Sequence, residues 1–225
     1  MAESNIGLTL KYFWDLIAGL NWEMRRGLLI CIEGLDRSGK TTQSHLLVEN
    51  LKSKGFEAVY TTEPSDGEIG RFIKRYVLRR RKRIPAHIEA LLFAADRVDH
   101  VEREIKPMLN EGKIVVSDRY IYSSLAYQGA AGLDVEWIRE VNRMVPEPDL
   151  AIYLEVPIDV IMERLRRKRR KSVMESPEIQ EKVREVYIKL VKEGKLIMVD
   201  GNRSITEVSR DIQKIVIDRL KQLEN

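Results

Sequence analysis

The stretch "EGLDRSGKTT" (33–42) constrains the fold of this 225-residue chain more than any other part of its sequence. It follows "LLICI" (28–32), a short apolar run typical of a buried strand. It precedes 41–55, where apolar residues recur at helical spacing and a glycine marks the end of the helix. Gly34-x-x-x-x-Gly39-Lys40-Thr41 therefore lies between a strand and a helix, with the spacing of a phosphate-binding loop.

A loop of this kind binds phosphate because its glycines let successive backbone N–H groups point at phosphate oxygens. The following helix adds its unpaired N-terminal donors and the positive end of its dipole. Lys40 would reach the β- and γ-phosphates, and the hydroxyl of Thr41 can bind Mg²⁺. A chance glycine turn explains the spacing but not the strand and helix beside it. We therefore predict a nucleoside triphosphate site formed by Gly34, Leu35, Asp36, Arg37, Ser38, Gly39, Lys40, Thr41 and Thr42.

Composition favours a single intracellular domain. The length suits one α/β domain with a full core, and 39 basic against 35 acidic residues give a net charge of +4. A charged fraction of 33% would suit a protein from a thermophile. Cys31 is the single cysteine, so the chain can form no internal disulfide; this indicates a reducing cytoplasm and argues against a zinc site.

The first 26 residues form an N-terminal extension to a domain spanning 27–225. "LTLKYFWDLIAGLNW" (8–22) is apolar, but Lys11 and Asp15 interrupt it and it is too short to span a bilayer. It also lacks the basic start and cleavage site of a signal peptide. An amphipathic helix packed on the domain or on a partner subunit is the favoured interpretation. A membrane-surface helix, disorder, or a true start at Met24 remain alternatives.

The rest of the domain alternates strands and helices. Further strands are expected at 57–62, 113–118, 150–156 and 195–200, and helices at 67–80, 85–110, 134–144, 157–169, 178–193 and 205–222. This alternation predicts an α/β fold of the P-loop NTPase type: a five-stranded parallel sheet with helices on both faces, and a basic lid at about 164–178.

Ligands bind beyond the carboxyl ends of parallel strands, so the polar residues that end strands are site candidates: Glu33, Glu63, Asp118 and Asp200. Asp118 would lie beside the phosphate-binding loop if the third strand neighbours the first, and could then hold Mg²⁺. A helix N-cap at Asp118, with Arg119 on a solvated face, is the structural alternative. Phe93 and Arg97 are four residues apart, on one helix face, which suits a nucleobase beside a guanidinium. Alone, such a pair is more often core plus surface.

Four stretches in this order resemble the thymidylate kinase family: "IEGLDRSGKTT", "TTEPSDGEIG", "LLFAADRVDH" and "SDRYIYSSLAYQGA". The similarity continues through "PDLAIYLEVP" to the last helix and covers roughly 27–220. The resemblance implies transfer of the γ-phosphoryl group of ATP to dTMP, giving dTDP and ADP, with Mg²⁺. It also implies a homodimer.

The resemblance further implies a role for individual residues. Asp36 would hold the deoxyribose 3′-hydroxyl, and Arg119 would bind the acceptor phosphate with help from Lys74. Arg37 would supply charge to the transferring phosphoryl group, which can be worth about 10³–10⁵ in rate. The thymine would be stacked by Phe93 and contacted at its polar edge by Arg97, Ser124 and Gln128. The catalytic set is Arg37, Lys40 and Asp118; Thr41 and Asp118 would bind metal, and Arg164 and Arg203 would join the ATP site.

The sequence departs from the family pattern at Thr62, where an arginine is usual, and in the lid, which lacks the common "DR-x-E" pattern. Arginine is available both in the loop and in the lid, and the sequence does not decide which acts. The basic run "RLRRKRRK" (164–171) leaves open a nucleic-acid-binding protein. Within enzymes, a kinase for another nucleoside monophosphate or for a deoxynucleoside is the nearer alternative. Selectivity for dTMP over dUMP rests on one methyl group, which adds only about 1–3 kcal/mol.

Overall fold

The computed structural model describes residues 27–80, 82–166 and 175–224. Five strands form one sheet: β1 (Leu28–Gly34), β2 (Ala58–Thr62), β3 (Ile114–Asp118), β4 (Leu150–Glu155) and β5 (Ile197–Asp200). Their order is β2-β3-β1-β4-β5, and every pair of neighbours is parallel. The predicted five-stranded parallel sheet is therefore confirmed.

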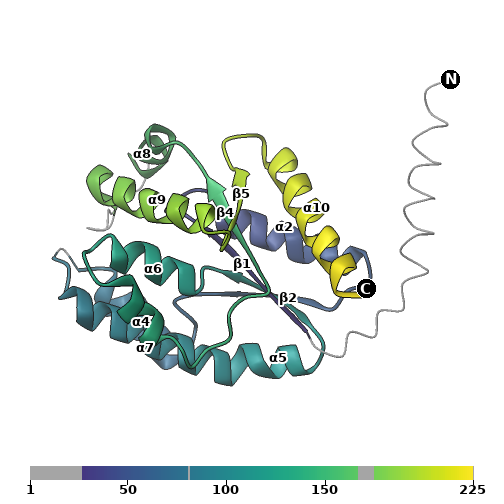
Figure 1. The fold of residues 1–225 in the computed structure, drawn as a ribbon, viewed down its shortest axis with the longest axis horizontal. Coiled ribbons are helices and arrows are strands. Elements are labelled where there is room, and N and C mark those ends of the chain that lie inside the picture. Colours follow the sequence, from purple (N-terminus) through teal and green to yellow (C-terminus); the bar gives the residue numbers. More distant parts are fainter. Residues whose placement is uncertain (1–26, 81, 167–174, 225) are drawn as a thin grey trace.

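Helices cover both faces of this sheet (Figure 1). They are α2 (Lys40–Ser53), α3 (Glu68–Phe72), η1 (Ile73–Val77), α4 (Ala86–His100), η2 (Val101–Ile105), α5 (Lys106–Asn110), α6 (Ile121–Gly129), α7 (Val135–Val141), α8 (Ile158–Arg166), α9 (Pro177–Lys192) and α10 (Ile205–Glu224). The helix predicted at 85–110 is present as α4, η2 and α5 in succession, with η2 a π-helical segment.

Strand β1 divides the core in two because successive side chains of a strand point to opposite faces. Leu29 and Cys31 belong to a buried cluster that α4, α6, α8 and α9 also supply. Ile30 and Ile32 belong to a second cluster, packed by α2 and α10. Such two-sided burial explains why β1 reads as a continuous apolar run.

Helix α6 was not among the helices expected from the sequence. Its nine residues contain serines and a glycine, which are poor helix formers. Burial holds it in place: Tyr122, Leu125 and Ala126 are almost inaccessible. At its start, Glu33 accepts hydrogen bonds from the backbone N–H groups of Tyr120 (2.9 Å) and Ser123 (3.2 Å). A carboxylate from β1 thus caps this helix, and no local pattern reveals that contact.

Two expectations lie outside the described residues: the helix at 8–22 and most of the lid, 167–174. Helix α8 leads toward the lid and α9 follows it. Within the described part of the chain, no helix combines the length and apolarity needed to cross a membrane.

Candidate active site

The phosphate-binding loop takes a backbone course that glycine makes possible. Gly34 and Gly39 have φ angles of 152° and 101°, where other residues are strained. A Cβ on Gly34 would also lie 2.6 Å from the Ser38 hydroxyl oxygen. Arg37 adopts φ 67° without being a glycine. Such a conformation costs of order 1–3 kcal/mol and is concentrated at functional sites.

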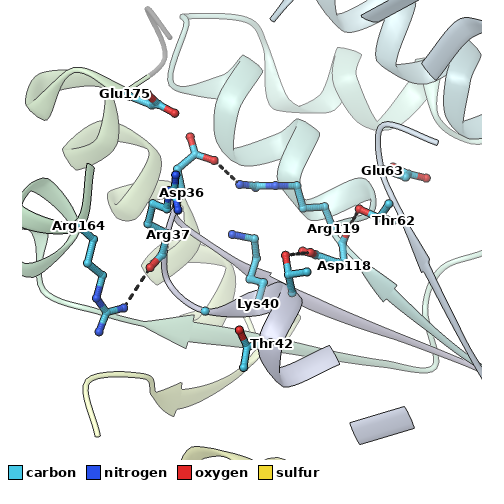
Figure 2. A pocket seen from close by; sticks show the side chains of 12 residues that line it. Asp36, Arg37, Lys40, Thr42, Thr62, Glu63, Asp118, Arg119, Arg164 and Glu175 are labelled. Atoms are coloured by element: carbon cyan, nitrogen blue, oxygen red, sulfur yellow. Dashed lines mark hydrogen bonds and ion pairs between the residues drawn. The ribbon is translucent and has the colours of Figure 1, made fainter. Parts of the chain in front are cut away.

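Lys40 is buried at the start of α2, where its Nζ donates a hydrogen bond of 2.6 Å to the carbonyl oxygen of Leu35. Burial and, after it, the nearby charge of Arg119 lower the pKa of Lys40 from 10.5 to about 8. Asp118, Asp36 and Glu33 act in the opposite direction. In Figure 2 the Lys40 amine lies between Asp36 and Asp118, where a bound polyphosphate would add negative charge.

Asp118 lies beside the loop, as predicted if β3 neighbours β1. Its residue register pairs it with Ile32 on β1 and Thr62 on β2. The Thr41 hydroxyl donates to Asp118 Oδ2 at 2.5 Å. Asp118 Oδ1 is buried and finds no hydrogen-bond partner within the described chain. A hydroxyl beside a carboxylate with a free oxygen is a donor set that fits Mg²⁺.

The loop and the end of β3 line a cavity of about 690 Å³, and a second cavity of about 200 Å³ adjoins it. The smaller cavity is lined by Phe93, Ser124, Tyr127 and Gln128, among other residues. Three residues line both cavities: Asp36, Arg119 and Glu175. These three residues therefore mark the junction between the two spaces.

Arg119 is fixed at this junction. Its Nη2 donates to Asp36 Oδ1 (2.7 Å), and its Nη1 donates to the Ser123 hydroxyl (3.0 Å). Its guanidinium also stands 5.1 Å from the ring centre of Tyr127. Like Arg37, it has a left-handed backbone, with φ 73°. Its interactions hold the positive charge in place before any ligand binds, which is the arrangement that electrostatic preorganisation requires.

Arg97 lies behind the smaller cavity rather than in its described lining. Its side chain is 1% exposed and donates to Glu63 Oε2 at 2.9 Å (Nε) and 2.6 Å (Nη2). Its Nη1 donates to the Ser124 hydroxyl (3.1 Å) and to Asn142 Oδ1 (2.6 Å). Arg97 thus contacts Ser124, which lines the cavity, and any direct contact of Arg97 with a base stays a prediction.

Of the other predicted residues, some line the cavities and others do not. Thr42 and Arg164 line the larger cavity, and Arg164 donates to the carbonyl oxygen of Arg37 at 3.0 Å. Lys74 pairs with Asp66 (2.7 Å) and is not among the described lining residues. The same holds for Arg203, which pairs with Asp211 and with Asp200.

The four strand-end candidates also divide. Asp118 and Glu63 line the larger cavity, whereas buried Glu33 caps α6 and exposed Asp200 accepts a hydrogen bond from the backbone of Asn202. Burial raises the pKa of Glu33, and its hydrogen bond from Ser123 opposes this effect.

Tyr127 and Glu175 line these cavities and were not predicted from the sequence. Tyr127 follows the predicted Ser124 by three residues, a helical spacing that would have revealed it if α6 had been expected. Glu175 has no comparable signal.

Comparison with known proteins places the chain among phosphotransferases. The family model described as thymidylate kinase matches residues 32–212. The chain is 45% identical over 198 residues to a probable thymidylate kinase of Thermococcus onnurineus, covering 84% of this chain and 97% of that protein. It is 45% identical over 199 residues to one of Pyrococcus horikoshii (85% and 96% covered), and 40% identical over 195 residues to one of Caldivirga maquilingensis (86% and 95% covered).

Proposed function

The chain belongs to the thymidylate kinase family, and we propose that it transfers the γ-phosphoryl group of ATP to dTMP, giving dTDP and ADP. One observation of the site carries the proposal. A cavity lined by the phosphate-binding loop meets a smaller cavity lined by Phe93, and both share Arg119. Two nucleotides bound in these spaces would bring their phosphates together at that arginine.

The larger cavity takes ATP. Backbone N–H groups of the loop and the start of α2 receive its phosphates, and Lys40 donates to the β- and γ-phosphate oxygens. Phosphoryl transfer depends mainly on positioning and on neutralising charge. Arg37 belongs to the same loop, so its backbone position relative to the donor phosphates is set by the loop itself. We therefore assign the catalytic charge to Arg37, with Arg164 as support through the Arg37 carbonyl.

Mg²⁺ would be held by Thr41 and Asp118, whose donor atoms fit it. When bound, it would neutralise charge on the phosphate oxygens. The chain's own contribution is to hold the Thr41 hydroxyl and the Asp118 carboxylate side by side at the ends of the loop and of β3.

The smaller cavity takes the acceptor. Phe93 offers a ring on which thymine stacks, and Ser124 and Gln128 supply polar atoms for the edge of the base. Arg119 binds the acceptor phosphate at the junction. Asp36, already hydrogen-bonded to Arg119, then accepts a hydrogen bond from the deoxyribose 3′-hydroxyl.

We also propose a cytoplasmic homodimer. The free thiol of Cys31 is buried in β1, as suits a reducing compartment. Large apolar side chains are about half exposed on two neighbouring segments, Phe72 and Tyr76 on α3 and η1, and Ile88 and Leu91 on α4. Exposed apolar side chains on neighbouring helices support association with a second copy.

The test is ADP release with a panel of nucleoside monophosphates, at saturating ATP and Mg²⁺. We expect dTMP to give the highest kcat/KM. A monophosphate that exceeded dTMP by about tenfold would make the named acceptor wrong and leave the kinase class intact. Titration with an unrelated oligonucleotide in increasing salt separates the nucleic-acid alternative, which predicts tight, salt-sensitive binding.

A further inference from the structure

Glu89 is a buried carboxylate for which the reaction described above has no use. It lies on α4, four residues before Phe93 and eight before Arg97, so the three share one face of the helix. Its side chain is 1% exposed. Arg83 binds it with two hydrogen bonds, from Nε to Oε2 (3.0 Å) and from Nη2 to Oε1 (2.7 Å). This paired geometry fixes the position of the carboxylate.

Gln128 connects Glu89 to the smaller cavity. Gln128 is 2% exposed, lines that cavity, and donates from Nε2 to Glu89 Oε1 at 2.9 Å. Its other amide atom, Oε1, is buried and accepts no hydrogen bond from any described part of the chain. An ionised carboxylate can only accept hydrogen bonds, so the NH₂ group of Gln128 must face Glu89. The oxygen is then the amide atom left for a ligand.

We propose that Glu89 is a positioning residue that sets base selectivity: by fixing the Gln128 amide, it presents an acceptor to the base and so selects pyrimidines that carry a hydrogen on N3. This inference rests on the proposed function. Thymine donates its N3–H to such an acceptor. Cytosine has a lone pair at N3, so two acceptors would face each other, and the buried oxygen would stay unpaired.

Ser124 has the same polarity for a separate reason. Its hydroxyl oxygen accepts a hydrogen bond from Nη1 of Arg97, a group that can only donate. The Ser124 proton therefore remains available to donate, which suits the 4-oxo group of thymine and not the 4-amino group of cytosine. Two ion pairs with buried carboxylates, Arg83–Glu89 and Arg97–Glu63, thus stand behind these two polar atoms of the cavity lining.

The test compares dTMP with 5-methyl-dCMP, because both carry the 5-methyl group and differ only in the hydrogen-bonding pattern at C4 and N3. For the wild type we expect kcat/KM to favour dTMP by more than about a thousandfold, as in sites built to pair a hydrogen-bonding group. Glu89→Gln lets residue 89 donate as well as accept, so the Gln128 amide can turn. We expect the preference to fall at least about tenfold, through KM, with kcat for dTMP changed by less than about threefold.

Glu89→Gln leaves Arg83 without its charge partner, which can prevent folding. The double variant Arg83→Gln/Glu89→Gln carries no unpaired charge and should lose the preference in the same way. The matched control is Glu155→Gln, another carboxylate held by an arginine (Arg184, 2.6 Å) but away from the described cavity linings. We expect its preference to equal that of the wild type.

The outcomes are distinct. A folded Glu89 variant that kept the wild-type preference would overturn the proposal. So would a variant in which kcat fell and KM rose by the same factors for both acceptors, because that pattern indicates a purely structural role. Failure of the proposed function appears separately, as a wild type that does not phosphorylate dTMP.

Discussion

Because Lys40 is buried, kcat/KM for ATP should depend on pH in a range where lysines normally stay charged. Its pKa is lowered from 10.5 to about 8, mainly by burial and then by Arg119. The value of kcat/KM for ATP reports ionisations of the free enzyme. Lys40 must be protonated to bind the triphosphate, so this constant should be flat below about pH 7 and about tenfold lower at pH 9. Bound phosphates favour the ammonium, so kcat should not show the same fall.

The assay measures dTDP directly by chromatography, which avoids coupling enzymes with their own pH dependence. The internal control is kcat/KM for dTMP at saturating ATP, where Lys40 is already protonated and no fall near pH 8 is expected. If kcat/KM for ATP stayed constant to about pH 9.5, burial would not lower the pKa of Lys40 in the free enzyme, and the prediction would be wrong. A parallel fall in kcat would assign the ionisation to the ternary complex instead.

Three further measurements test other parts of the site. Arg37→Ala should lower kcat at least about a hundredfold with modest changes in KM, whereas Arg164→Ala should cost less than about tenfold, and the reverse order would place the catalytic charge in the lid. Phe93→Ala should raise KM for dTMP by the loss of about 1–3 kcal/mol of stacking, and an effect confined to ATP would contradict the assignment of the smaller cavity. Burial alone would lower the pKa of His100, but Glu104 and Glu63 raise it from 6.5 to about 9, so its contribution to stability is complete below pH 6.5 and lost as the pH rises through 9. The Tm of the wild type should fall over that interval, and that of His100→Gln should fall less.

The sheet was predictable because its signals are local. Each strand is a short apolar run, and the glycine spacing of 34–39 identifies the turn after the first one. Helix α6 was not predictable in the same way, because its stability comes from burial and from Glu33. Glu33 lies 88 residues before Ile121, the first residue of the helix, and meets the start of the helix only after folding.

The site shows the same division. Asp118 could be placed beside Thr41 by combining a strand end with one assumption about strand order, and the geometry confirms that arrangement. The sequence places Arg97 on a helix face, but it does not predict how deeply the Arg97 side chain is buried. Its five N–H donors are taken up by Glu63, Ser124, Asn142 and the backbone carbonyl of Tyr120, partners from three other segments. Which buried groups satisfy a buried cation is decided by tertiary packing, and no spacing in the sequence encodes it.

The charges around the larger cavity bear on the remaining alternative, that the basic run 164–171 binds nucleic acid. Among the described lining residues, basic and acidic side chains are equal in number: Arg37, Lys40, Arg119 and Arg164 against Asp36, Glu63, Asp118 and Glu175. A site of balanced charge that receives a triphosphate and a monophosphate needs additional cations, since their phosphates repel each other in a water-poor space. Mg²⁺, which we propose is held by Thr41 and Asp118, would supply part of that charge. The sequence places five consecutive cations at 167–171, directly after the helix that carries Arg164 to the cavity. Two phosphate-bearing substrates thus call for additional cations, so the basic run of the sequence does not by itself require a nucleic-acid partner.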